Sequence, residues 1–389
     1  MPIDKRLREW ASPRQCEIID AIVEHVTYGR AAKALGIGKR RVEEAVRLAK
    51  KRAAAAGYSP QHDMGHTVPE GFHVRGVSTL YGAEGVKLQW VKSQRDAEHR
   101  HEVLVEAIRS IAEPFAGTGK APARVEQTKS ADLLPVLVWG DVHLGMLSWG
   151  EETGADFDLA IAERTLCAAV DKLVALSPPS DQALIVSVGD LLHYDSMQAK
   201  TVHSGHVLDT DTRLPKIVRC AVRMIRWCIE RALERHGRVK FVYVPGNHDA
   251  VGSVMLSIAL SEFYSNEPRV EVDTSPNPFR YHRFGKVLLG MVHGDRTKPQ
   301  DLPGIMAADR PRDWGETTTR RMLCGHVHHD QVKEFRGCTV ETFRTLAPKD
   351  AWHNIEGYRS GQDMKCIVFH GEHGEILRHT VGISMLEAA

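Results

Sequence analysis

Short motifs containing aspartate, histidine and asparagine recur along the chain between residues 141 and 328. The motifs are GDVH, VGD, GNHD, VHGD and GHVH, and their candidate metal ligands are Asp141, His143, Asp190, Asn247, His293, His326 and His328. Two divalent cations held by such oxygen and imidazole ligands can activate water, clamp a phosphate and neutralise the charge of in-line attack. The motifs therefore predict an enzyme that hydrolyses phosphoesters with two metal ions.

Spacing within the motifs supports a shared site. In an extended segment, residues two apart point to the same side, so Asp141 with His143 and His326 with His328 can each aim both side chains at one place. A mixed set of oxygen and nitrogen ligands favours Mn²⁺ or Fe, while Zn²⁺ and Mg²⁺ are open alternatives. We expect a dinuclear centre with Mn²⁺ as the best candidate.

The order of these motifs closely resembles the signature of the calcineurin-like metallophosphoesterase superfamily, which reads D-x-H, G-D, G-N-H-[DE], H and G-H-x-H. The resemblance covers residues 132–345 and implies a four-layer α/β/β/α sandwich. It also implies that one metal is bound by Asp141, His143, Asp190 and His328. The second metal would be bound by Asn247, His293 and His326, with Asp190 as the bridge between the two ions.

The same resemblance leaves His248 free of metal. Its implied role is to protonate the leaving oxygen or to stabilise the transition state, and Asp249 would orient it, as carboxylates often do for catalytic imidazoles. The alternative is a degenerate scaffold that binds no metal. Every signature position is present in this chain, which favours the catalytic interpretation.

Buried strands must position these residues. Apolar, β-prone runs precede each motif: LLPVLVW, ALIVS, VKFVY, KVLLGMV and RRMLC. Helical stretches at 158–176 and 212–236 separate the first three runs, which predicts a layered α/β fold with its site at the carboxyl ends of the strands. These two helices could also form the interface of a homodimer.

The N-terminal part has a different composition. Residues 1–57 contain thirteen Lys and Arg against seven Asp and Glu, and apolar residues there are spaced as in a helix–turn–helix. Such a unit would place Lys39, Arg40, Arg41 and Arg47 against DNA. The alternative is a helical bundle with a solvated charged face. Together with the run STLYGAEGVKLQWVKS, this region resembles proteins of bacteriophages and prophages.

Composition and breaker residues suggest the domain limits. We predict a helix–turn–helix domain at 1–57, a β-hairpin and a polar helix at 58–113, a linker at 114–131, and a metallophosphoesterase domain at 132–389. The hairpin turns around residues 82–85, and the polar helix runs from about 95 to 111. Seven scattered cysteines without a CxxC pair predict reduced thiols. With no signal peptide or apolar span of about 20 residues, we expect a soluble, cytoplasmic protein of a bacterium or a phage-infected cell.

Residues around the motifs bear on the substrate. DVHLG and GDLLH resemble the SbcD-type DNA repair nucleases, which would place His193 near the substrate phosphate; a second role for His193 is structural. The GDYVDRG run of the phosphoprotein phosphatases is absent, which favours a diester. In the run 346–364, Trp352, His353 and Arg359 could line a substrate groove, or the run could pack on a sheet edge.

Three functions follow from these observations. The leading one is a DNA phosphodiesterase or nuclease that is targeted by its N-terminal domain. The second is a phosphatase or cyclic-nucleotide phosphodiesterase that acts on small molecules or protein. The third is a DNA-binding regulator or phage assembly factor that uses the phosphoesterase fold as a scaffold.

Overall fold

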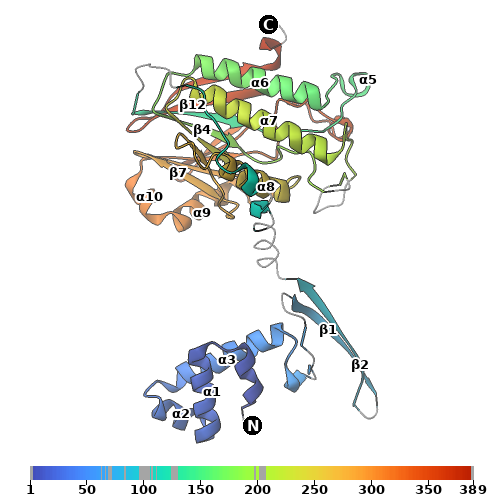
Figure 1. Ribbon diagram of the computed structural model, residues 1–389, viewed down its shortest axis with the longest axis vertical. Coiled ribbons are helices and arrows are strands. Elements are labelled where there is room, and N and C mark those ends of the chain that lie inside the picture. The colour runs from blue at the N-terminus through green and yellow to red at the C-terminus, as the bar shows by residue number, and fades with distance from the viewer. Residues whose placement is uncertain are drawn as a thin grey trace. The chain divides into compact units, whose positions relative to one another are not determined.

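The computed structural model describes residues 3–62, 64–65, 67–68, 72–82, 85–95, 106, 108–110, 112–123, 130–196, 199–200 and 207–386. The chain divides into two compact units, Met1–Leu104 and Val105–Ala389. Blue and cyan mark the first unit in Figure 1, and teal to red mark the second. Each unit is described by itself below.

Short helices make up the beginning of the first unit. They are η1 (Lys5–Trp10), α1 (Pro13–His25), α2 (Tyr28–Ala34), α3 (Lys39–Ala55) and η2 (Pro60–His62). Ser12 and Gln15 form a capping box at the start of α1, and Thr27 caps α2. Ile18 and Ile22 of α1 pack with Val42 and Val46 of α3 in a small apolar core. The helix–turn–helix assignment of these elements stays a prediction.

Two long strands follow the helices. β1 (Phe72–Gly82) and β2 (Gly85–Arg95) pair antiparallel, with Gly82 opposite Gly85. This pairing agrees with the predicted hairpin, although residues 83–84 at its turn lie outside the described residues. Most of the helix predicted at 95–111 also lies outside them.

The larger sheet of the second unit has six strands in the order β13-β12-β3-β4-β5-β6. The strands are β3 (Leu133–Trp139), β4 (Gln182–Ser187), β5 (Arg238–Tyr243), β6 (Val270–Val272), β12 (Asp363–His370) and β13 (Gly374–Gly382). β3 to β6 run parallel, whereas β12 pairs antiparallel with both β3 and β13. The parallel strands therefore bring the ends of β3, β4 and β5 to one edge of the sheet.

A second sheet of five strands has the order β10-β11-β9-β8-β7. Its strands are β7 (Arg280–Phe284), β8 (Val287–Val292), β9 (Thr319–Cys324), β10 (Gln331–Phe335) and β11 (Cys338–Thr342). β8, β9 and β11 run parallel, and β7 and β10 are antiparallel edge strands. The β-prone runs at 133–139, 183–187, 239–243, 286–292 and 320–324 thus correspond to β3, β4, β5, β8 and β9, within one residue at each end.

Helices and short turns connect these strands. They are η3 (Glu113–Phe115), α5 (Gly150–Thr153), α6 (Leu159–Leu176), α7 (Leu214–Leu233), α8 (Ala250–Phe263), η4 (Pro299–Asp301), α9 (Leu302–Asp309), α10 (Pro311–Glu316), α11 (Ala351–Ile355) and η5 (Ile383–Met385). α6 and α7 confirm the helices predicted at 158–176 and 212–236. No helix among the described residues is long and apolar enough to span a membrane.

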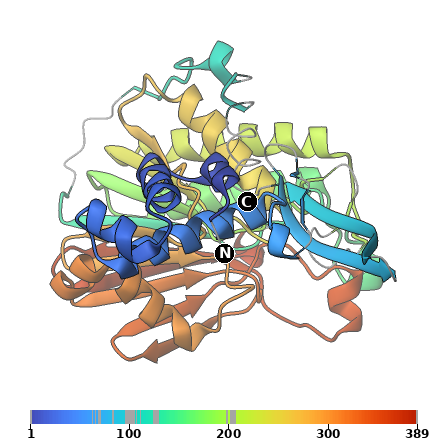
Figure 2. The same ribbon diagram turned by 90° about the horizontal axis from the view of Figure 1, so that it is seen from below.

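Alternating side chains of the strands fill separate cores. Leu137 and Trp139 of β3 pack with α6 and α7, whereas Val136 and Val138 of the same strand pack toward β8 and β9. A third cluster joins β8 and β9 to α9. In Figures 1 and 2 the green helices α6 and α7 lie on one side and the orange strands on the other. The fold is mixed α/β; the finer four-layer assignment stays a prediction.

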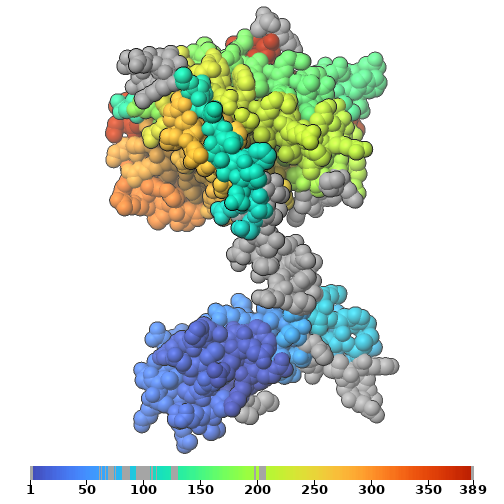
Figure 3. Space-filling view, viewed as in Figure 1, coloured from blue at the N-terminus to red at the C-terminus, as the bar shows by residue number. Residues whose placement is uncertain are grey.

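Part of the segment predicted as a linker is packed. Gly117 N donates to Glu262 O, Gly119 N donates to Phe263 O, and Arg269 donates through Nη2 to Pro122 O. Residues 112–123 therefore lie along the end of α8, and Figure 3 shows them in teal against the rest of the second unit. The residues that would form a free linker, 124–129, lie outside the described part of the chain.

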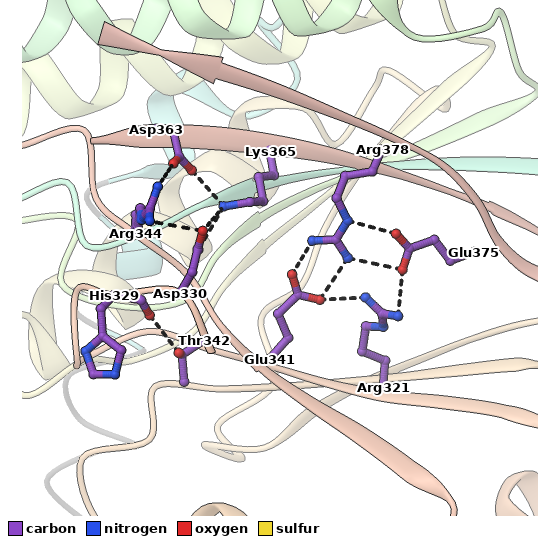
Figure 4. A network of polar contacts seen from close by, with 10 residues as sticks. All are labelled: Arg321, His329, Asp330, Glu341, Thr342, Arg344, Asp363, Lys365, Glu375 and Arg378. Carbon is purple, nitrogen blue, oxygen red and sulfur yellow. Dashed lines mark hydrogen bonds and ion pairs between the residues drawn. The ribbon is translucent and has the colours of Figure 1, made fainter. Parts of the chain in front are cut away.

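Paired charges join the two sheets near the end of β9. Lys365 of β12 contacts Asp330 and Asp363, each at 2.7 Å, and Arg344 contacts the same two carboxylates (Figure 4). Asp330 follows the GHVH motif, so this group of two acids and two bases fixes the loop that carries His326 and His328. Arg321, Glu341, Glu375 and Arg378 form a second such group beside it.

Replacing the buried amine tests this role. We expect Lys365→Met to lower the free energy of unfolding by about 2 kcal/mol, because Asp330 and Asp363 would lose their charged hydrogen bonds to the amine and share only Arg344. Urea denaturation followed by circular dichroism measures the change. The control Lys333→Met removes an exposed lysine from β10 and should change stability by no more than about 0.5 kcal/mol. Equal effects of the two substitutions would contradict the prediction.

Candidate metal centre

The candidate ligands all follow strands of the two sheets. Asp141, Asp190 and Asn247 come after β3, β4 and β5, while His293 and the pair His326 and His328 come after β8 and β9. Four of these residues have a positive φ: His143 at 51°, Asp190 at 49°, His326 at 68° and His328 at 53°. Such backbone is unfavourable for residues other than glycine and is concentrated at functional sites. The loops thus use strained turns to direct these side chains inward.

One group of ligands comprises Asp141, His143 and His328, whose ligand atoms all lie within 4.8 Å of one another. His328 Nε2 lies 2.9 Å from Asp141 Oδ2 and 3.1 Å from His143 Nε2. Asp141 and His143 are buried, and Asp141 Oδ2 also accepts a hydrogen bond of 2.8 Å from the backbone of His326. The GDVH and GHVH motifs are therefore held together by one carboxylate.

A second group comprises Asp190, His293 and His326. His293 Nε2 lies 3.1 Å from Asp190 Oδ2 and 2.9 Å from Asn247 Oδ1. Its other nitrogen, Nδ1, donates to Val188 O at 2.9 Å, which presents Nε2 to the site as in many metal-binding histidines. Asn247 thus belongs with this group, and the bridging role of Asp190 stays a prediction.

Protonation at the two groups differs. Burial, and then the charges of His248 and His328, hold the pKa of His143 well below its usual value, so its imidazole is neutral. Burial also opposes the charge of His293, but Asp190 and Asp141 outweigh it and raise the pKa of His293 to about 10. The neutral imidazole of His143 is the form that binds a metal. At His293, a metal ion would replace the proton that Asp190 and Asp141 stabilise.

The surroundings of the two aspartates, Asp141 and Asp190, are suited to a bound cation. Asp141 Oδ1 is buried and has no hydrogen-bond partner among the described residues. Buried polar atoms are normally paired, so this oxygen is available to a metal. A Cβ on Gly325 would overlap Asp141 Oδ1, and one on Gly246 would overlap Asp190 Oδ1. The glycines of the GHVH and GNHD motifs therefore leave the room that both carboxylates need.

The orientation of His248 differs from the prediction. Asp249 does not contact its ring: the buried carboxylate accepts hydrogen bonds from Tyr243 Oη at 2.5 Å, Leu192 N at 3.0 Å and Gly246 N at 3.0 Å. His248 Nδ1 instead donates to His193 O at 2.8 Å. Burial, and then the charge of Asp190, raise the pKa of Asp249 to about 7. Asp249 thus joins two loops, and a backbone carbonyl orients His248.

His193 forms a third candidate group with His143 and His248, and the ligand atoms of the three also lie within 4.8 Å of one another. Its Nδ1 is 3.2 Å from His143 Nδ1, and its ring stacks on His248 with the centroids 5.5 Å apart. Burial, and then the charge of His248, lower the pKa of His193 to about 3. The side chain lines the cavity described next, and its place near the substrate phosphate stays a prediction.

A cavity of about 700 Å³ opens above both groups. His143, Asp190, Asn247, His248, His326 and His328 line its floor and walls together with Trp352 and His353. Arg359 does not reach it; this arginine lines an adjacent hollow of about 340 Å³ and donates to Tyr358 O at 2.7 Å. Trp352 and His353 therefore share a cavity with the candidate metal ligands, and their role in a substrate groove stays a prediction.

Sequence reasoning missed the role of Asp350. Its carboxylate accepts from the backbone of His353 at 2.8 Å and lies 2.7 Å from His353 Nδ1, so it caps α11 and fixes the ring. His353 in turn stacks on His328 with the centroids 5.0 Å apart. The D-x-x-H spacing before a short helix was the available signal, since Asp is a preferred N-cap residue.

The four predicted DNA-contacting residues lie on α3 in the first unit, all of them exposed. Lys39, Arg40 and Arg41 form the first turn, which contains no acidic residue. Lys39 lies 3.5 Å from Glu43, and Arg47 donates to Glu44 at 2.5 Å. Lys39 and Arg47 are thus paired within their own helix, whereas Arg40 and Arg41 add two further cations to its first turn.

Comparisons with solved structures gave distant matches. They include a predicted phosphoesterase of Streptococcus pneumoniae TIGR4, with 11% identity, 64% of this chain and 98% of that chain covered, and a TM-score of 0.27. A novel archaeal phosphodiesterase has 10% identity, coverages of 64% and 99%, and a TM-score of 0.33. A putative 5'-nucleotidase from Staphylococcus aureus has 11% identity, coverages of 64% and 54%, and a TM-score of 0.33. At these TM-scores the matches support no conclusion.

Comparison of the chain with protein-family models gives a match over most of the second unit. A search of curated proteins found no match. The family model of the calcineurin-like phosphoesterases matches residues 134–358, which is more than half of the 389-residue chain and includes every candidate ligand. The chain therefore belongs to the calcineurin-like phosphoesterase family of metal-dependent phosphoester hydrolases.

Proposed function

We propose that this protein is a dinuclear metal-dependent phosphodiesterase that acts on DNA. The observation that carries the proposal is the convergence of two ligand groups, one around Asp141 and one around Asp190, beneath one cavity. Asp141, His143 and His328 would hold the first ion, and Asn247, His293 and His326 the second, with Asp190 shared. Mn²⁺ is the best candidate; Fe, Zn²⁺ and Mg²⁺ are alternatives. When bound, the ions supply an activated water and charge neutralisation at the phosphate.

His248 supplies the proton in this proposal. Because Nδ1 donates to a carbonyl, which can only accept, the second nitrogen Nε2 is left for the substrate. In its protonated form, His248 would deliver the Nε2 proton to the leaving oxygen. His193 and His353 bound the same cavity and would position the phosphate. This division of work keeps proton transfer separate from the metal ligands.

The DNA substrate is supported by the first unit. The N-terminus of α3 carries a partial positive charge from its backbone, and Gly38 provides no side-chain cap there. Lys39, Arg40 and Arg41 add three cations at the same end, which is unfavourable for a helix unless an anion is bound. A phosphate backbone would supply that anion. The first unit would therefore hold DNA while the second hydrolyses it.

Substitutions at adjacent residues separate metal binding from catalysis. We expect His248→Ala to lower kcat for a short DNA strand by about 10²- to 10⁴-fold, because the leaving sugar oxygen needs a proton from the general acid, while both ligand groups stay intact. Asn247→Ala should lower both kcat and the metal content, because it removes a candidate ligand. Hydrolysis with Mn²⁺ and metal analysis of the purified proteins measure the two effects.

The exposed His373, at the turn after β12, provides the control for these variants. His373→Ala should keep the kcat and the metal content of the unchanged protein. Normal turnover by His248→Ala would contradict its role as the acid. Hydrolysis of p-nitrophenyl phosphate without hydrolysis of the diester would favour a phosphatase, and DNA binding without any turnover would favour a regulatory scaffold.

DNA binding can be tested on one helix with equal changes of charge. Arg40→Gln combined with Arg41→Gln removes two cations from the first turn of α3, and Lys50→Gln with Lys51→Gln removes two exposed cations near its other end. We expect the first pair to weaken binding of duplex DNA. The slope of log K against log salt should become shallower by about 0.9 for each phosphate that the variant no longer neutralises.

Fluorescence anisotropy of a labelled duplex at several salt concentrations gives both quantities. The control pair should leave the slope close to that of the unchanged protein. Equal weakening by both pairs would mean that binding depends on net charge alone, and no weakening by either pair would reject α3 as the DNA-binding helix.

A further inference from the structure

Two aromatic side chains next to the metal ligands remain half-exposed. Trp352 is 51% exposed and Tyr358 is 47% exposed, although both line the cavity above the candidate centre. Their rings stack on each other with centroids 5.7 Å apart and an angle of 27°. We call this pair the aromatic shelf. Large apolar rings that are left uncovered inside a polar site offer their faces to a ligand.

The shelf adjoins the phosphate position. His353 stacks on the candidate ligand His328, and the Trp352 ring meets His353 edge-on with centroids 4.9 Å apart. Only one imidazole therefore separates the shelf from the metal ligands. A phosphate bound at the centre would bring the group attached to it against Trp352 or Tyr358.

Hydrogen bonds fix the shelf in place. Asp350 caps α11, Asn354 Nδ2 donates to Glu152 O at 2.9 Å, and Ser148 Oγ donates to Lys349 O at 2.8 Å. These bonds join the shelf to α5 and to the loop after β3. A prearranged aromatic surface loses little conformational freedom when a ring stacks on it.

Positive charge continues beyond the shelf. The adjacent hollow of about 340 Å³ shares His328, His353 and Tyr358 with the larger cavity and adds Lys349 and Arg359. The cations thus share this hollow with the Tyr358 ring and with the candidate ligand His328. A nucleotide chain would place a base on the rings and a neighbouring phosphate against these cations.

From this arrangement we propose that Trp352 and Tyr358 form a nucleobase subsite beside the scissile phosphate. The proposal rests on the phosphodiesterase function and specifies its substrate: a nucleotide whose base is unstacked, as in a single strand. Aromatic side chains stack on any base, so the subsite would select nucleosides over other alcohols without reading sequence.

Binding of two simple phosphates tests the subsite without requiring turnover. Thymidine 5'-monophosphate and methyl phosphate both carry a phosphate, but only the first carries a base. Isothermal titration calorimetry of the full chain with Mn²⁺ gives both dissociation constants, and we expect thymidine 5'-monophosphate to bind more tightly. Trp352→Ala should reduce this preference by about 5- to 100-fold, the range for loss of one stacked base.

Two further variants make the result specific. Trp352→Phe keeps an aromatic face and should retain most of the preference, while Trp227→Ala removes a 39%-exposed tryptophan of α7 and should leave it unchanged. No preference in the unchanged protein, or an unaltered preference in Trp352→Ala, would overturn the subsite. A nucleoside preference without hydrolysis of bis-p-nitrophenyl phosphate would support the subsite and reject the phosphodiesterase function.

Discussion

The burial of two carboxylates, Asp141 and Asp190, is the constraint on which the second unit depends. Each is about 1% exposed, and each uses one oxygen to accept a backbone N–H from a different motif: His326 N for Asp141 and His248 N for Asp190. Buried anions need such donors and cations around them. The same two residues therefore join strand ends that are far apart in sequence and create the demand for positive charge that metal ions can meet.

Other parts of the fold help to accommodate the two buried carboxylates. Positive φ at four candidate ligands turns the side chains back toward the carboxylates, and Gly246 and Gly325 leave space for their oxygens. The groups around Lys365 and Arg378 then fix β12 and β13 against the loop that follows β9. Each group pairs equal numbers of acids and bases, so the sheets carry buried charge without adding to the negative potential of the centre.

The sequence predicted the strands, and placed the candidate ligands at their ends, where a single short motif contains both the apolar strand and the polar residue that follows it. Apolar runs that end in Asp or His predicted β3, β4, β5, β8 and β9, because buried parallel strands need such runs. Six of the seven candidate ligands fall into two groups that could each hold a metal ion, because the loops that carry them follow the ends of these strands. Contacts between distant segments were not predictable: Asp249 next to His248 in sequence turned out to bind Tyr243, Leu192 and Gly246. The packing of residues 112–123 on α8 was hidden by their Ala, Gly and Pro content.

The bond from His248 Nδ1 to the carbonyl of residue 193 has an evolutionary consequence. Every amino acid supplies that oxygen, so this hydrogen bond would remain if the side chain at position 193, which stacks on the His248 ring, were replaced. Mutation can therefore change this wall of the cavity, and with it the substrates that fit, while His248, the proposed proton donor, keeps this hydrogen bond. A main-chain support of this kind separates the adaptation of specificity from the preservation of chemistry.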